Sequence, residues 1–248
     1  NQFIRHIVKK IGLLGGMSWE STSYYYDAIN KRTKEILGGF HSAEIILYSV
    51  DFEVIEKLQS IGDWDGQASI LKEAAKIIEL AGADFLVVCS NTMHKVASEI
   101  ERAIKIPLLH IVDATAEQLL IDGIDKIGLI GTSFTMKEDF YKKKLENNYG
   151  IAVIVPNHSD QKKINNIIYN ELCQGIIDDN SREDYLNIIE KLAANGAQAV
   201  VLGCTEIGML ISSEDANVPL YDTTLIHSRC AVDYALASSG MRNETKHI

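Results

Sequence analysis

The sequence contains the same short patterns twice, and this repeat decides the fold. IGLLGGMS at residues 11–18 resembles IGLIGTSF at residues 127–134, and GADFLVVCSNT at residues 82–92 resembles GAQAVVLGCTE at residues 196–206. Each copy holds an apolar run that ends in glycine or small polar residues. Runs of this kind are typical of strands buried on both faces of a parallel sheet.

A third match places Pro107 and Pro219 at equivalent points, in a chain that has only three prolines. The three matches occur in the same order and are shifted along the chain by nearly the same interval. A general likeness among buried strands explains the apolar runs but not their ordered spacing. We therefore predict a duplicated α/β unit, with residues 1–112 and 222–248 in the first domain and residues 113–221 in the second.

Segments with helical periodicity separate the apolar runs in both halves. The pattern predicts two parallel sheets flanked by helices and joined by right-handed crossovers, with the final helix returning to the first domain. Strands are expected at residues 8–14, 43–50, 85–89, 108–112, 126–130, 152–155, 199–202 and 220–222. Helices are expected up to residue 37 and at residues 70–80, 163–173, 184–194 and 226–237.

Composition excludes several classes of protein. Apolar residues make up 46% and charged residues 23%, so the chain can bury a core, and its net charge of −10 disfavours binding to nucleic acid or anionic membranes. No apolar run approaches the roughly 20 residues of a membrane helix. Asn1–Lys10 has no signal-peptide layout. These features predict a soluble cytoplasmic protein.

The four cysteines, Cys89, Cys173, Cys204 and Cys230, show no CxxC pair and no close spacing. This pattern predicts free thiols in a reducing compartment rather than a disulfide framework or a metal site. Cys173 and Cys230 fall on apolar helix faces and are expected to be structural.

Small or polar residues follow four of the expected strands, at residues 15–18, 89–92, 131–133 and 203–206. Ligands of open parallel sheets bind beyond the carboxyl ends of strands, so these loops are expected to meet in one cleft between the halves and to hold a small anion such as a carboxylate. The first loop lacks both the Walker ending and the three-glycine spacing of a dinucleotide site.

Cys204 is the main catalytic candidate. It ends an expected strand and precedes Thr205-Glu206, a pair suited to a helix start. A thiol at a helix N-terminus has a lowered pKa and is a usable base near neutral pH. The alternative, a small buried hydrophobe, is disfavoured because the position matches a second polar strand end in the repeat.

Three motifs resemble the aspartate/glutamate racemase family of cofactor-independent amino-acid racemases. CSNTMH at residues 89–94 and VLGCTEIG at residues 201–208 resemble its two cysteine signatures, and GGMSWEST at residues 15–22 resembles the opening of its aspartate-racemase branch. The resemblance implies two α/β domains with the site between them, a homodimer, and two opposed cysteines as acid and base. It implies neither pyridoxal phosphate nor a metal.

The sequence departs from this pattern at one catalytic position. Ser90 stands where the family usually has its first cysteine, and the internal repeat also pairs Ser90, not Cys89, with Cys204. Successive strand residues point to opposite faces, so we expect Cys89 in the core and Ser90 in the cleft. A local bulge that turns Cys89 inward is the alternative.

Racemisation needs a proton carrier on each face of the α-carbon. We expect Cys204 to serve one face efficiently and Ser90 the other face slowly, which makes an asymmetric enzyme. The resemblance implies an acidic amino acid, aspartate or glutamate, and a lysine for its second carboxylate, for which Lys163 at an expected helix start is the candidate. The α-carboxylate and the rest of the substrate are assigned to Met17, Ser18, Gln59, Asn91, Thr92, Thr132, Thr205 and Glu206.

Two other functions stay open. Arylmalonate decarboxylases resemble this family and keep only the second cysteine, so a single-cysteine decarboxylase fits Cys204. A non-catalytic protein that binds acidic amino acids fits the missing first cysteine.

Overall fold

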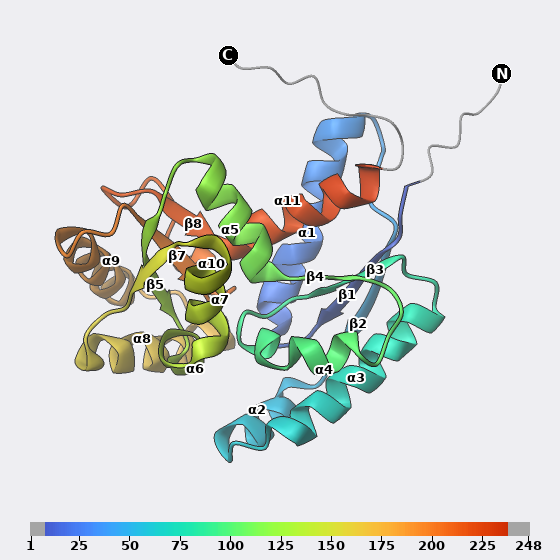
Figure 1. Cartoon of the computed structure of the whole chain (residues 1–248), viewed down its shortest axis with the longest axis horizontal. Helices are drawn as coiled ribbons and strands as arrows, with labels where there is room; N and C mark the ends of the chain where they lie inside the picture. The colour runs from blue at the N-terminus through green and yellow to red at the C-terminus, as the bar shows by residue number, and fades with distance from the viewer. Residues whose placement is uncertain (1–7, 238–248) are drawn as a thin grey trace.

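The computed structural model describes residues 8–237, which form two parallel sheets of four strands each (Figure 1). Their strand orders are β2-β1-β3-β4 and β6-β5-β7-β8, so the two halves share one topology and the predicted fold class is confirmed. Residues 1–7 and 238–248, which the sequence assigns to the first domain, lie outside the described residues. The strands are β1 (Ile11–Gly15), β2 (Ile45–Ser49), β3 (Phe85–Val88), β4 (Leu108–Leu109), β5 (Lys126–Gly131), β6 (Ala152–Ile154), β7 (Ala199–Gly203) and β8 (Leu220–Asp222).

Helices flank both sheets. Within residues 8–237, none combines the length and the apolar character of a membrane span. Before β5 the chain forms α1 (Trp19–Leu37), α2 (Phe52–Ser60), α3 (Trp64–Leu80), η1 (Thr92–Val96), α4 (Ala97–Glu101) and α5 (Ile111–Ile121). After β5 it forms α6 (Ser133–Lys137), α7 (Asp139–Tyr149), α8 (His158–Asn170), η2 (Leu172–Gln174), α9 (Asp179–Ala194), α10 (Ile207–Leu210) and α11 (Thr223–Leu236).

Several predicted boundaries are wrong, and the helices expected from residues 70 and 184 begin earlier, at Trp64 and Asp179. The strand expected at residues 108–112 stops at Leu109, because the His110 side chain accepts a hydrogen bond from the Val112 amide at 3.2 Å and caps α5. The helix expected to begin at Lys163 begins at His158, because Asn157 caps it by accepting from the Asp160 amide. In addition, the sequence analysis missed several helices, among them α2, α5 and α7.

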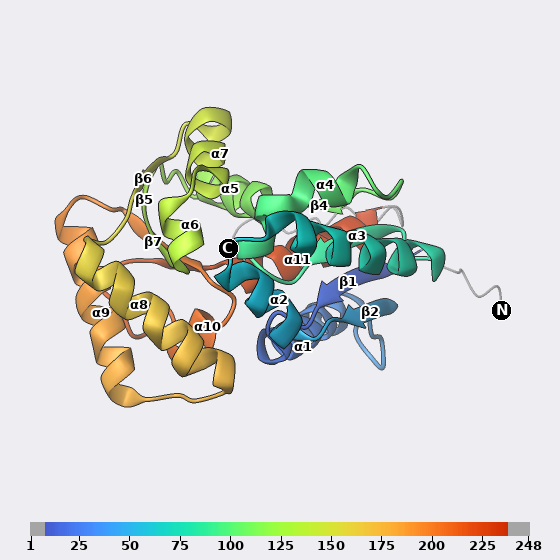
Figure 2. The same ribbon diagram turned by 90° about the horizontal axis from the view of Figure 1, so that it is seen from below.

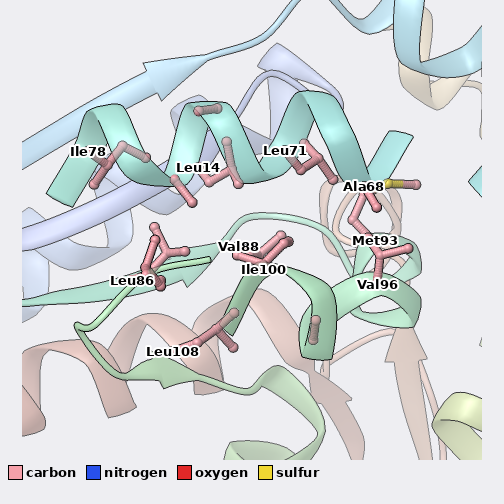
Figure 3. Close-up of a cluster of buried hydrophobic side chains, with 14 of the residues drawn as sticks. Leu14, Ala68, Leu71, Ile78, Leu86, Val88, Met93, Val96, Ile100 and Leu108 are labelled. Atoms are coloured by element: carbon pink, nitrogen blue, oxygen red, sulfur yellow. The ribbon is translucent and has the colours of Figure 1, made fainter. Parts of the chain in front are cut away.

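The first sheet packs against α3 and α4 through a buried aliphatic cluster (Figure 3). Leu14 of β1 and Val88 of β3 meet Leu71 of α3 and Ile100 of α4, and all four side chains are fully buried. Burying one such side chain stabilises the fold by about 1.5–3 kcal/mol. A comparable cluster around Ile130 packs β5 and β7 against α8 and α9, so each half has its own core.

The last described helix, α11, crosses back to the first sheet. Its Ala231 and Val232 pack with Ile11 and Leu13 of β1, and it crosses and contacts α1 (Figure 1), while Figure 2 shows the two halves side by side. It also contacts α5. The chain passes from one half to the other twice, after β4 and again after β8. The two crossings hold the carboxyl ends of the two sheets close to each other.

Candidate active site

The loops that follow β1, β3, β5 and β7 meet in a cavity between the two halves. In parallel sheets these carboxyl ends are where ligands usually bind. The cavity is lined by Met17, Phe52, Gln59, Ser90, Asn91, Thr92, Met93, Thr132, Ile168, Tyr169, Cys173, Cys204, Thr205 and Glu206.

The cavity is narrow in this structure. The volume that the centre of a water molecule can occupy inside it is about 20 Å³. This is close to what one water molecule needs. An amino acid is several times larger than water, so its binding requires the walls of the cavity to separate.

Cys204 follows β7 and is 6% exposed. Its Sγ donates a hydrogen bond to Glu206 Oε2 at 3.0 Å. Burial, followed by the charge of Glu206, raises the pKa of the Cys204 thiol well above its usual value. The prediction of a lowered pKa is therefore wrong in this structure. The following helix, α10, has only four residues, and the nearest charge is negative.

Glu206 is a buried carboxylate that joins the two halves. Its Oε2 accepts from Cys204 and, at 2.9 Å, from the Thr205 hydroxyl. Its Oε1 accepts from the Ser18 hydroxyl at 2.7 Å and from the Ser18 amide at 3.2 Å. Ser18 was predicted to bind substrate directly, but it lies behind Glu206 and does not line the cavity. It also caps α1.

Cys89 and Ser90 lie on opposite sides of the β3 end. Cys89 is fully buried in the core with Ile11 and Leu13, and burial raises the pKa of its thiol. Ser90 lines the cavity, and its hydroxyl accepts from the Met93 amide at 3.4 Å. No bulge turns Cys89 into the cavity, so the residue that faces Cys204 from the other half is Ser90.

His94 holds the Ser90 loop against the start of α5. Its Nδ1 lies 2.6 Å from the Ser90 carbonyl, and its Nε2 accepts from the Ile111 amide at 3.2 Å. A carbonyl only accepts, so Nδ1 carries the proton and the ring is neutral. Burial and the neighbouring His110 and His227 lower the pKa of His94 well below its usual value, which keeps the ring neutral.

Hydroxyl and amide groups line the part of the cavity nearest the strand ends. Thr92 and Thr132, one from each half, share a hydrogen bond of 2.9 Å between their hydroxyls. The Asn91 side chain donates to the Thr223 hydroxyl at 2.9 Å, whereas its buried Oδ1 has no hydrogen-bond partner among the described residues. A buried acceptor without a partner is costly, so a ligand donor would be stabilised there.

Two helices form another part of the cavity lining. Phe52 and Gln59 come from α2, and Ile168 and Tyr169 come from α8. Gln59 Nε2 donates to the Tyr169 hydroxyl at 3.0 Å, which joins the two halves across the cavity.

Comparison with known proteins identifies the family. The family model described as Asp/Glu/Hydantoin racemase matches residues 14–231. The chain belongs to this racemase family. The matched range includes all four loops that form the cavity.

Several relatives cover nearly the whole chain. A candidate Asp/Glu racemase from Yersinia pestis is 55% identical, with a TM-score of 0.85, over 92% of this chain and 99% of that one. An aspartate racemase homologue from Pyrococcus horikoshii OT3 is 38% identical, with a TM-score of 0.80, over 92% and 99%. A broad-specificity amino-acid racemase from Bacillus subtilis is 24% identical over 92% of this chain and 98% of that protein. Amino-acid racemases are isomerases, and this chain is an isomerase of that kind.

Most of the side chains predicted from the racemase resemblance do meet in the cavity, but Ser18 and Lys163 do not. Lys163 lies in the second turn of α8 on its outer side, where its Nζ pairs with Asp184 Oδ1 at 2.6 Å and is about half exposed. It lines a separate surface depression with Ser159 and Asn166. The structure therefore does not bring Lys163 together with Cys204 and Ser90.

The sequence analysis missed five cavity residues: Phe52, Met93, Ile168, Tyr169 and Cys173. Phe52 begins α2 directly after β2, so its position beyond a strand end was a usable signal. Cys173, expected to be structural, lies in η2 and lines the cavity. Among residues 8–237, no group of three His, Cys, Asp or Glu side chains is arranged to hold a metal ion.

Proposed function

We propose that the protein racemises a free α-amino acid by moving a proton on each face of the α-carbon, with Cys204 on one face and Ser90 on the other. The observation that carries this proposal is their symmetry. They follow the equivalent strands β7 and β3 of two sheets with the same strand order, and they line one cavity. Two proton carriers on opposite sides of a carbon are what stereochemical inversion requires.

The polar side of the cavity fits the invariant part of an amino acid. The hydroxyls of Thr92, Thr132 and Thr205 are suited to the α-carboxylate, whose hydrogen bonds strengthen as the carbanion shares its charge. The partnerless Asn91 Oδ1 and the Glu206 carboxylate are suited to the ammonium group. The substrate carboxylate would thus accept hydrogen bonds from the threonine hydroxyls, and the substrate ammonium group would donate to Asn91 Oδ1 and Glu206.

Glu206 gives the buried thiol a route to ionisation. The Cys204 proton passes to Glu206 Oε2, and the resulting thiolate takes the α-proton as the substrate becomes a carbanion. Ser90 then gives its hydroxyl proton to the opposite face and regains one from water, and Glu206 returns its proton to the solvent before the next turnover. A hydroxyl ionises far less readily than a thiol, so we expect proton exchange on the Ser90 face to be slower than on the Cys204 face.

The family description names aspartate and glutamate, so the D and L forms of both acids are the first substrates to assay. Because the carbanion is stabilised by the substrate carboxylate in this scheme, we propose a reaction without pyridoxal phosphate. From the family resemblance we also propose a cytoplasmic homodimer.

The test is exchange of the α-proton in deuterated water, followed by proton NMR. Cys204→Ala should lower the exchange rate by about two orders of magnitude or more, because the principal base is removed. Cys230→Ala is the matched control, since Cys230 lies outside the cavity; it should keep the wild-type rate.

Undiminished exchange in Cys204→Ala would end the proposal. Exchange by the wild-type protein would also separate a racemase from a protein that only binds amino acids. Release of CO2 from a disubstituted malonate, without exchange, would favour the decarboxylase instead.

A further inference from the structure

His94 is a buried imidazole to which the proposed proton transfers give no role. It lies in η1 and is 3% exposed. Burying a polar ring is costly unless its nitrogens have hydrogen-bond partners, and both of them do here. Nδ1 lies 2.6 Å from the Ser90 carbonyl, and Nε2 lies 3.2 Å from the Ile111 amide. One ring thus joins the loop that carries Ser90 to the start of α5.

The start of α5 is fixed to the second half of the molecule. Ile111 is fully buried in a cluster that it shares with side chains of β5 and β7, among them Val201. Cys204 directly follows β7. The ring of His94 therefore connects Ser90, in the first half, to the packed body that carries Cys204.

The two contacts of the ring require one protonation state. The Ser90 carbonyl only accepts and the Ile111 amide only donates, so His94 is neutral with its proton on Nδ1. Burial, followed by the neighbouring His110 and His227, lowers the pKa of His94, which favours this neutral form. A second proton on Nε2 would face the amide hydrogen of Ile111, and the link would be lost.

The Ser90 hydroxyl has a weak hold of its own. It accepts from the Met93 amide at 3.4 Å, which is longer than the roughly 2.7–3.2 Å of most such bonds. The place of the hydroxyl opposite Cys204 therefore depends on the backbone of residue 90, which His94 holds. The narrow cavity has to widen to admit an amino acid, and Ser90 has to return to the same place afterwards. Misplacing a reacting group by 1 Å can lower a rate by about two orders of magnitude.

We propose that His94 is a positioning residue for Ser90, and that it sets how often the carbanion is protonated on the Ser90 face rather than again on the Cys204 face. The inference rests on the proposed function, in which Cys204 removes the α-proton and Ser90 completes the inversion. His94 does not line the cavity, so it acts through Ser90 and not on the substrate.

The two faces of the carbanion can be followed separately in deuterated water. A substrate whose α-proton faces Cys204 is deuterated with retention when the deuteron comes from the Cys204 face, and with inversion when it comes from the Ser90 face. Proton NMR measures the exchange, and chiral chromatography measures the inversion, for the D and L forms of glutamate and aspartate. The ratio of inversion to exchange with retention then compares the Ser90 face with the Cys204 face.

Two substitutions of His94 test the link. His94→Ala should lower the ratio by about tenfold or more, because Ser90 moves while Cys204 keeps its place. His94→Asn keeps a donor where Nδ1 stood but loses the contact with Ile111, so its ratio should fall by less. An unchanged ratio in either variant that folds, even with both rates lowered, would show a merely structural role and would overturn the inference.

His227→Gln is the matched control. His227 packs against His94 in the same buried cluster, but its hydrogen bonds go to Leu109 and Tyr25. The control weakens the cluster without contacting the Ser90 loop, so its ratio should stay at the wild-type value. A fall as large as that of His94→Ala would overturn the inference. Wild-type protein that exchanges none of the four substrates would instead overturn the proposed function.

Nitrogen-15 NMR of histidine-labelled protein tests the link without turnover. Near pH 7.5, His94 should appear as a neutral ring with its proton on Nδ1. A charged ring, or a neutral ring with its proton on Nε2, would present a donor to the Ile111 amide and would overturn the inference.

Discussion

Cys89 and Ser90 are neighbours in the chain, yet their side chains have opposite surroundings. Alternation along an extended strand sends the thiol into the core beside Ile11 and Leu13 and the hydroxyl into the cavity. A reactive group at position 89 is therefore separated from the substrate by the backbone. At the residue scale, the chemistry depends on which of two adjacent positions carries the sulfur.

Ser90→Cys is predicted to raise the rate of proton exchange from the slower face, because a thiol ionises more readily than a hydroxyl. The measurement is the initial exchange rate of each enantiomer in deuterated water. No change in the slower direction would argue against a role for position 90.

The control at this scale is Cys89→Ala. It should keep both exchange rates, since its side chain does not reach the cavity, and should lower the free energy of unfolding by about 1–2 kcal/mol. Loss of exchange with the fold intact would assign the second proton carrier to Cys89 instead.

The turn between β1 and α1 shows how an element shapes the site. Gly16 has φ of +92°, and a Cβ there would collide with the carbonyl and amide of Val50. The Val50 amide in turn donates to the Gly15 carbonyl at 3.0 Å, so the two loops are held together. This close approach brings Met17 to the cavity and Ser18 to Glu206.

Gly16→Ala is predicted to lower the free energy of unfolding by about 2 kcal/mol or more and to reduce exchange, as the turn moves away from Glu206. Gly82→Ala is a matched control, since Gly82 has φ of +96° but no atom within 4 Å of a built Cβ. Urea unfolding measures the free energy of unfolding of both variants. The two share the strain of an alanine at positive φ, so the extra loss in Gly16→Ala is the cost of the collision with Val50. Equal losses would contradict the collision.

At the scale of the whole molecule, a buried histidine cluster stands where the two halves join. His227 of α11 donates from Nε2 to the Leu109 carbonyl at 2.8 Å, and its Nδ1 accepts from the Tyr25 hydroxyl at 2.9 Å. Its ring also packs against His94, which in turn packs against His110. Burial lowers the pKa of His227 to about 4 and that of His110 to about 3.

These shifts predict a loss of stability in acid. Above the ordinary histidine pKa of about 6.5, both the folded and the unfolded chain hold neutral rings, and the stabilisation is complete. As the pH falls toward 4, only the unfolded chain takes up protons at His227, which costs up to about 3 kcal/mol for this residue alone. Urea unfolding at several pH values between 7.5 and 4.5 measures this slope.

His227→Gln should be less stable at pH 7.5, because the glutamine replaces only part of the hydrogen bonding, and should show a shallower loss below pH 6.5. A slope as steep as that of the wild type would assign the acid sensitivity to other groups.

The sequence by itself determined the duplicated α/β topology and the loops that meet in the cavity, and it favoured Ser90 over Cys89 as the residue facing that cavity. These features follow from local rules: apolar strand runs, glycine-marked strand ends and alternation along a strand. The boundary between β4 and α5 was beyond those rules. Ile111 and Val112 are buried whether they extend a strand or begin a helix, and the His110 cap decides between the two.

Only the tertiary structure decided the electrostatics of the cavity and the residues that α8 brings to it. The raised pKa of Cys204 comes from burial and from a carboxylate held in place by Ser18 of the other half. Lys163 and Tyr169 share α8, yet the packing of that helix sends the lysine to Asp184 and the tyrosine to Gln59. Such pairings join residues far apart in the chain, and their energies depend on burial, which exists only once the two halves have come together.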